Sequence, residues 1–307
     1  MRYRKLPGTD LQLSVVGLGC WAIGGKWWGD DVDDDSSAVT IHAALDAGID
    51  WVDTAPLYGH GHADELLAST LGPKLRELVV VTKVGVRFDA ERDHAESFLE
   101  PDFVRQDCEA SLRRLGLERI DLLMAHWPCE HGTPLDDTIE ALESLKQEGK
   151  IRHWGLCNYG PEPLADAMER GCAALQTPYS MIRRDFDYGL REVVQPDRAQ
   201  TPKLGVLAYE TLGRGLLTGK FRGLPRFTSS DLRSRDPRFH GPRFARTAQW
   251  VDLLRQASER TGLPPAALAT GWTLARPGIA VAIAGAKRPG QIRETARAAE
   301  LLDRPDA

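Results

Sequence analysis

Short apolar segments alternate with helical segments eight times along the 307-residue chain, and this alternation limits the folds available to it. The predicted strands are residues 15–18, 51–53, 79–83, 122–126, 153–158, 174–176, 206–209 and 279–283. The predicted helices are residues 36–47, 62–71, 102–115, 135–147, 161–170, 186–194, 264–275 and 289–302. Strands that alternate with helices indicate a parallel sheet. Eight such units predict an α/β fold of the (β/α)8 TIM barrel type.

Two segments do not belong to this alternation. Apolar pieces around residues 3–6 and 11–18 are separated by Pro7-Gly8-Thr9-Asp10, which predicts an N-terminal β-hairpin before the first barrel strand. Strand 7 is followed by a step too long for one crossover, and within it residues 220–243 show no sustained period. We predict a long loop here, over the carboxyl ends of the strands. No second domain is needed, so we expect one domain over residues 1–307.

Composition excludes several classes of function. The formal net charge is −5, which argues against a nucleic-acid partner. No apolar run approaches the ~18 residues of a membrane span, and the N-terminus lacks the apolar centre of a signal peptide. The five cysteines are scattered and form no C-x-x-C pair, which is typical of a reducing compartment. We therefore expect a cytoplasmic protein with neither a nucleic-acid nor a membrane partner.

Polar residues end four consecutive predicted strands. They are Asp53, Lys83, His126 and Asn158, and Tyr58 follows Asp53 on a loop broken by proline and glycine. A charged group at the end of an interior strand is costly unless it has a partner there. Because parallel strands end at the same side of a barrel, we predict that these residues form one site.

The residue types suit the reduction of a carbonyl group. A hydride added to a carbonyl leaves an alkoxide that needs a proton, and a free tyrosine titrates near 10, too high for an efficient donor. A neighbouring Lys83 ammonium would lower the pKa of Tyr58, and Asp53 would hold the lysine charge. A histidine such as His126 can donate a hydrogen bond to the carbonyl oxygen and orient it.

Local motifs carry a family resemblance. They are D-T-A-x-x-Y-G at 53–59, T-K at 82–83, H-W-P at 126–128, G-L-C-N-Y at 155–159, Q-T-P-Y at 176–179, L-G-R-G-L-L-T-G-K at 212–220 and A-I-A-G-A at 282–286. In this order they resemble the aldo-keto reductase superfamily over roughly residues 3–302. The resemblance implies a catalytic tetrad in which Tyr58 is the acid, Lys83 and Asp53 tune it, and His126 orients the substrate.

The resemblance also implies a nicotinamide cofactor, NADPH with NADH possible. It assigns Asn158 and Gln176 to the nicotinamide amide and Tyr209 to stacking. The remaining implied cofactor residues are Leu212, Gly213, Gly215, Ile283, Gly285, Lys287, Arg288, Gln291 and Glu294. Residues 285–297 carry four basic side chains against one acid, and this excess favours the 2′-phosphate of NADPH. The alternative is that these side chains are the solvated face of the last helix.

Aromatic residues are the candidates for substrate contact. Four tryptophans follow strands on loops, namely Trp21, Trp27, Trp28 and Trp127. They either line a pocket for an apolar or sugar carbonyl compound or pack the barrel rim. We further predict that the segment 220–243, rich in arginine and phenylalanine, folds over the bound cofactor.

Other interpretations remain. Residues 17–22 match a relaxed G-x-G-x-x-G/A dinucleotide pattern, but a loop rather than a helix follows them. His126, Cys129 and His131 offer metal ligands at irregular spacing, and we predict no metal. Two rival functions are a nucleotide-binding regulatory subunit of the same fold and a metal-dependent barrel hydrolase.

Overall fold

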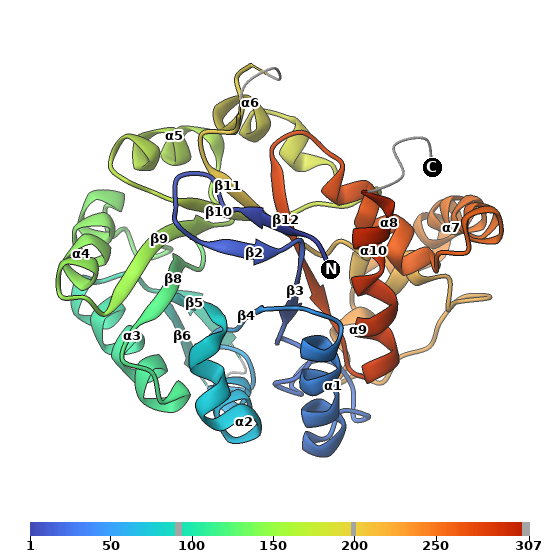
Figure 1. Ribbon diagram of the computed structural model, residues 1–307, viewed down its shortest axis with the longest axis horizontal. Coiled ribbons are helices and arrows are strands. Elements are labelled where there is room, and N and C mark those ends of the chain that lie inside the picture. Colours follow the sequence, from blue (N-terminus) through green and yellow to red (C-terminus); the bar gives the residue numbers. More distant parts are fainter. Residues whose placement is uncertain (90–93, 198–200, 303–307) are drawn as a thin grey trace.

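The computed structural model describes residues 1–89, 94–197 and 201–302, and eight parallel strands form a closed barrel at its centre (Figure 1). The ranges 90–93, 198–200 and 303–307 of the predicted 1–307 domain lie outside the described residues. The barrel strands are β3 (Val16–Gly19), β4 (Trp51–Asp53), β5 (Val79–Val84), β8 (Ile120–Ala125), β9 (Ile151–Cys157), β10 (Ala174–Pro178), β11 (Gly205–Tyr209) and β12 (Ile279–Gly285). The predicted (β/α)8 barrel is confirmed.

Helices surround the strands (Figure 1). They are α1 (Asp34–Asp46), α2 (His62–Leu71), α3 (Pro101–Leu115), α4 (Leu135–Gln147), α5 (Pro161–Glu169), α6 (Leu190–Val194), α7 (Gly241–Thr261), α8 (Pro265–Leu274), α9 (Pro289–Ala296) and α10 (Ala298–Leu301). Short 3-10 helices are η1 (Gly72–Glu77), η2 (Asp185–Asp187), η3 (Gly213–Thr218), η4 (Leu232–Ser234) and η5 (Pro237–Phe239). Several helices begin with proline, whose missing N–H costs nothing in the first turn. In the described ranges, no helix is both long and apolar enough to cross a membrane.

The N-terminal hairpin is present as β1 (Tyr3–Lys5) and β2 (Gln12–Ser14). Leu13 of β2 and the adjoining Leu6 and Leu11 are buried with Trp51 and Leu122 in the interior of the barrel. The hairpin therefore fills one end of the barrel, which leaves the opposite end for a site.

Two expectations about local structure were wrong, and one hairpin was not predicted. The hairpin pairs β6 (Val86–Asp89) with β7 (His94–Ser97). The helix expected at 186–194 begins only at Leu190, because Gly189 adopts φ +83° and separates it from η2. The predicted loop is also shorter than residues 220–243, because α7 starts at Gly241.

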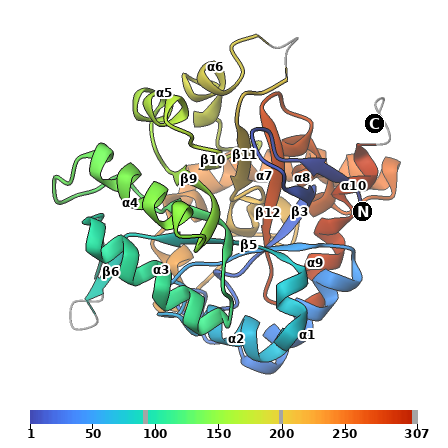
Figure 2. The same ribbon diagram turned by 60° about the vertical axis from the view of Figure 1, so that its left-hand side comes forward.

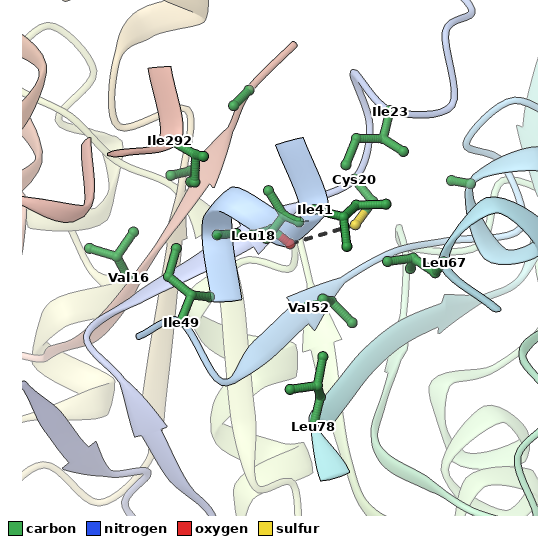
Figure 3. Close-up of a cluster of buried hydrophobic side chains, with 14 of the residues drawn as sticks. Val16, Leu18, Cys20, Ile23, Ile41, Ile49, Val52, Leu67, Leu78 and Ile292 are labelled. Carbon is green, nitrogen blue, oxygen red and sulfur yellow. Dashed lines mark hydrogen bonds between the residues drawn. The ribbon is translucent and has the colours of Figure 1, made fainter. Parts of the chain in front are cut away.

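A layer of apolar side chains joins the barrel to its helices (Figure 3). Val16 and Leu18 of β3 and Val52 of β4 are packed in one buried cluster with Ile41 of α1 and Ile292 of α9. Side chains packed at this density fix the strands in place. The carboxyl ends of the strands are thereby held as a rigid platform, and Figure 2 shows the same arrangement from a second side.

Candidate active site

A buried ion pair lies at the carboxyl ends of β4 and β5. The Lys83 ammonium donates to Asp53 Oδ1 at 2.8 Å and to the Thr54 carbonyl at 3.0 Å. The two charged side chains are only 1% and 4% exposed. The β4–β5 register places the strand ends side by side, with Asp53 opposite Val81. Because both charges have partners, the desolvation cost of burying them is offset.

Two glycines bring the Tyr58 loop against the loop that follows β3. A Cβ on Gly24 would lie 2.7 Å from the Tyr58 carbonyl carbon, and one on Gly59 would lie 2.4 Å from the Gly24 oxygen. Gly59 also has φ +62°, a conformation that L side chains rarely adopt. This close approach stacks Trp21 on the Tyr58 ring at 6.2 Å between centroids.

Tyr58, Lys83 and His126 meet at one point. The Lys83 ammonium lies 4.9 Å from the centroid of the Tyr58 ring. The His126 ring meets Tyr58 edge-on at 6.2 Å and stacks on Trp127 at 4.5 Å. The residues predicted as a tetrad are therefore brought together.

Burial governs the charge states of this group. It raises the pKa of Tyr58, and the nearby Lys83 charge opposes this only in part. Burial opposes the ammonium form of Lys83, but Asp53 and Tyr58 outweigh it and raise the Lys83 pKa. Burial and the Lys83 charge lower the pKa of His126. At neutral pH the site thus holds a protonated phenol, an ammonium and a neutral imidazole. The expected net lowering of the Tyr58 pKa by lysine does not occur in this structure, because burial dominates.

A cavity of about 460 Å³ opens above the ion pair. The predicted residues that line it are Asp53, Tyr58, His126, Asn158, Gln176, Tyr209, Leu212, Gly215, Ile283, Gly285, Lys287, Gln291, Glu294, Trp21, Trp28 and Trp127. Gly213, Arg288 and Trp27 are not among its lining residues, and Lys83 is buried beneath it.

The polar groups at the ends of β9 to β11 form a network at the cavity floor. Gln176 Nε2 donates to the free carboxylate oxygen of Asp53 at 2.6 Å. Asn158 Nδ2 donates to the His126 carbonyl at 3.1 Å, and the Tyr209 hydroxyl donates to Asn158 Oδ1 at 2.7 Å. Asn158 has φ +67°, a conformation that asparagine tolerates better than most residues. These contacts join residues at the ends of β9, β10 and β11 to Asp53 and to the His126 carbonyl.

The other end of the cavity lies at the N-terminus of α9. Gln291 Oε1 accepts the backbone N–H groups of Lys287 and Arg288, at 2.9 and 3.2 Å. The Lys287 ammonium contacts the Trp28 carbonyl and pairs with Asp31 Oδ1 at 2.6 Å. Arg288 reaches Asp31 Oδ2 at 3.7 Å. Both predicted phosphate ligands therefore already face one carboxylate.

The segment 220–240, here called the lid segment, covers part of this cavity. The Leu232 N–H donates to the Trp27 carbonyl at 2.9 Å, and Trp28 forms an antiparallel bridge with Asp231. Lys220 and Arg233 of the lid segment line the cavity. Phe221, Phe227 and Phe239 pack edge to face on one another. The lid segment is thus docked on the loop that follows β3.

Sequence reasoning missed the polar network that holds the lid segment. Glu210, at φ +53°, accepts hydrogen bonds from Arg183, Arg214 and Arg238 at 3.4, 2.7 and 2.8 Å. Arg214 and Arg238 also contact Asp236. The available signal was the acid at 210 directly after a buried strand, together with the density of arginines in the lid segment.

No metal centre is found in the described ranges. Nowhere among these residues do three His, Cys, Asp or Glu side chains converge as metal ligands. The His131 ring instead contacts Glu96 at 3.0 Å, and the backbone N–H of His131 donates to Cys129 Sγ at 3.4 Å.

The structure is a (β/α)8 barrel that holds a phenol beside a buried lysine–aspartate pair at the carboxyl ends of its strands, the end at which barrel enzymes carry their active sites. The family model for the Aldo/keto reductase family matches residues 15–306. The chain belongs to this family. Family membership supports a general carbonyl oxidoreductase activity with a nicotinamide cofactor.

Individual relatives are of similar length. Aldo-keto reductase YhdN of Bacillus subtilis (strain 168) is 36% identical over 298 residues, 95% of this chain and 87% of the relative. The NADH-specific methylglyoxal reductase of Escherichia coli (strain K12) is 29% identical, over 97% of this chain and 94% of the relative. The solved structure of the glycerol dehydrogenase AKR11B4 from Gluconobacter oxydans has a TM-score of 0.85 at 37% identity. The match covers 96% of this chain and 89% of the dehydrogenase chain.

Proposed function

We propose that the chain reduces an aldehyde or ketone to an alcohol by direct hydride transfer from NAD(P)H, with Tyr58 as the proton donor. One observation carries the proposal: the Tyr58 phenol and the His126 imidazole line one cavity above the buried Lys83–Asp53 pair. The nicotinamide supplies the hydride when bound.

Each residue of the group has a distinct task. Tyr58 is protonated at neutral pH and donates its proton to the developing alkoxide. The Lys83 ammonium lies against the phenol ring and stabilises the phenolate that this transfer leaves. Asp53 fixes the lysine charge, and the neutral His126 donates an N–H to the carbonyl oxygen.

The cavity suits a nicotinamide nucleotide. The indole N–H groups of Trp21 and Trp28 are buried at its wall without hydrogen-bond partners in the described structure, so they are available to a ligand. Asn158 and Gln176 would hold the nicotinamide amide, and the Tyr209 ring would stack on it. The N-terminus of α9, with Lys287 and Gln291, suits the phosphate end.

For the cofactor we propose that NADPH is preferred over NADH, and that Asp31 reduces this preference. Lys287 and Arg288 are the candidate ligands of the 2′-phosphate, but Asp31 faces both of them. The Lys287→Ala/Arg288→Ala variant should weaken the binding of NADPH about tenfold or more relative to that of NADH. Asp31→Asn should strengthen the binding of NADPH relative to that of NADH. The control is Arg293→Ala on α9. If both dissociation constants move together in the double variant, the 2′-phosphate is not bound there.

For the substrate we propose a small carbonyl compound held among Trp21, Trp28 and Trp127. The two relatives named for glycerol and methylglyoxal act on compounds of about this size. We also propose that residues 1–307 form one domain. We further propose that the protein is cytoplasmic, because none of its five cysteines is paired.

A carbonyl panel with NADPH and NADH tests the function. Purified protein is mixed with glyceraldehyde, methylglyoxal, benzaldehyde and a ketose, and the absorbance of the reduced nicotinamide is followed. We expect turnover with at least one aldehyde and its loss in Tyr58→Phe. Cofactor binding without turnover on any carbonyl would instead indicate a regulatory subunit.

A further inference from the structure

A second cavity of about 1000 Å³ adjoins the active site. It lies between residues 25–30 of the loop after β3, residues 182–183 and parts of 229–243, and we call it the basic vestibule. Arg183 and Arg214 line both cavities. The two cavities therefore adjoin at these two side chains.

The vestibule has an excess of positive charge. Its basic lining residues among the described ones are Lys26, Arg183, Arg214, Arg235, Arg238 and Arg243. Its acidic lining residues are Asp30 and Asp236, and Glu210 lies behind three of the arginines. Asp185 also pairs with Arg183 at 3.1 Å, so six cations face four carboxylates, an excess of two positive charges in a chain whose formal charge is −5. Such a concentration of one sign in a concave site attracts an anion.

The buried acids hold the arginines in place. Arg214 uses Nε on Glu210 and Nη1 on Asp236, and Arg238 also spans both acids. Each guanidinium has further N–H donors beyond these contacts. The acids thus fix the planes of the arginines and leave donors directed elsewhere.

Two further arginines have no such partners. Arg235 and Arg243 are exposed, and within the described structure neither has an ion pair. Arg243 stands in the first turn of α7, which carries no acidic residue and has no side-chain cap. The positive end of this 21-residue helix adds to the field of the vestibule.

The vestibule is connected to the proton donor through aromatic contacts. The Arg214 guanidinium lies 5.7 Å from the Trp21 ring, and Trp21 stacks on Tyr58 at 6.2 Å. Arg214 thus links the lining of the vestibule to the aromatic pair that contains Tyr58.

We propose that the basic vestibule binds the phosphate of a short phosphorylated aldehyde whose carbonyl carbon is reduced at Tyr58. The proposal rests on the proposed function and names its substrate class. A phosphate monoester is favoured over a carboxylate because it is close to a dianion with three acceptor oxygens. Three acceptor oxygens can take donors from several arginines at once, whereas a planar carboxylate pairs best with a single guanidinium.

The kinetic test compares matched substrates. With NADPH, glyceraldehyde 3-phosphate should exceed glyceraldehyde in kcat/KM by about tenfold or more. Its KM should rise with salt because the vestibule is open to solvent. A second pair, succinic semialdehyde and butanal, measures the preference for a carboxylate in the same way. Equal kcat/KM for the first pair, or a larger preference in the second pair, would overturn the phosphate assignment.

Variants locate the effect. Arg235→Gln/Arg243→Gln should lower the ratio of kcat/KM for glyceraldehyde 3-phosphate to that for glyceraldehyde by about tenfold. Arg260→Gln, near the far end of α7, is the charge-matched control and should leave both values unchanged. An unchanged ratio in the double variant would overturn the proposal.

A binding measurement separates this proposal from the proposed function. Trp27 lines the vestibule, so tryptophan fluorescence can follow titration with glycerol 3-phosphate, with glycerol as control. Saturable binding that the double variant weakens about tenfold supports the phosphate site even if no carbonyl is reduced. Reduction of glyceraldehyde without such binding would leave the function standing and overturn the phosphate site.

Discussion

Two ionic networks stand at the same end of the barrel and differ in what holds them. The Asp53–Lys83 pair belongs to adjacent strands, and its side chains are at most 4% exposed. The network around Glu210 and Asp236 joins the end of β11 to the lid segment, and its arginines are 23% to 39% exposed. The first is fixed by strand register, whereas the second depends on loops that come together.

We infer that the buried pair serves the reaction, whereas the network around Glu210 and Asp236 controls access to the cavity. A buried pair on a rigid scaffold keeps the proposed proton donor, Tyr58, at a constant geometry and charge state. A half-buried network between loops is weaker, so we propose that the lid segment it holds opens without disturbing the barrel. The four predictions that follow test this contrast, from the largest expected effect to the smallest.

Lys83→Met should damage the first network most. The variant leaves the Asp53 carboxylate buried without its cation, which costs about 3–5 kcal/mol of stability. Adding Asp53→Asn should restore most of this stability but not the activity. Urea unfolding and aldehyde turnover measure the two effects. A double variant as unstable as the single one would show that the pair is not the reason for the loss.

Tyr58→Phe should lower turnover by at least about 10²-fold, because the proton donor is lost while the ring is kept. Stability and the dissociation constant for NADPH should change little. Tyr188→Phe, at a side chain 79% exposed, is the control. Near wild-type turnover in Tyr58→Phe would remove the acid assignment.

Glu210→Gln should loosen the lid segment and spare the barrel. Three arginines lose their shared carboxylate, at a cost of about 1–3 kcal/mol. Cleavage within 220–240 by a protease should become faster, and NADPH should slow it. Asp252→Asn removes an exposed pair with Arg255 and should cost less than about 0.5 kcal/mol. Equal cleavage with and without NADPH in wild type would contradict the lid interpretation.

Acid and alkali should weaken the two networks separately. Burial raises the pKa of Glu210, but Arg214 and Arg238 lower it overall. Its stabilisation is therefore present above the ordinary Glu pKa of about 4.3 and is lost as pH falls through the lowered value. The Lys83 pKa is raised, so its contribution is present below about 10.4 and is lost as pH rises through the folded value.

The measurement is limited proteolysis of the lid segment between pH 5 and pH 3. Cleavage of wild type should increase with acid while far-UV circular dichroism stays constant. The Glu210→Gln variant should show a smaller change, since the titrating group is absent. Loss of barrel structure before lid cleavage increases would refute the contrast.

The sequence predicted the barrel and the clustering at its strand ends because both depend on local periodicity. The expected bounds of the helix at 135–147 agree with α4, and Asp53 indeed ends β4. Helix α7 was missed because most of its surface is polar: only Thr247, Val251 and Leu254 are buried along its 21 residues.

Contacts between distant loops were beyond sequence reasoning. The role of Glu210 was not predicted, since its partners Arg183 and Arg238 lie 27 and 28 residues away. The pair of Lys287 with Asp31 joins residues 256 apart. Burial around Tyr58 also depends on the folded loops, so the direction of its pKa shift was not predictable.

The central claim is direct hydride transfer onto a carbonyl carbon beside Tyr58. The most direct measurement uses NADPH deuterated at both C4 positions, an aldehyde substrate and mass spectrometry of the alcohol. We predict one deuterium on the carbinol carbon of every product molecule, and none when deuterium is supplied only by the solvent. An alcohol whose carbinol hydrogen comes from solvent, or a chain that forms no alcohol, would contradict the account.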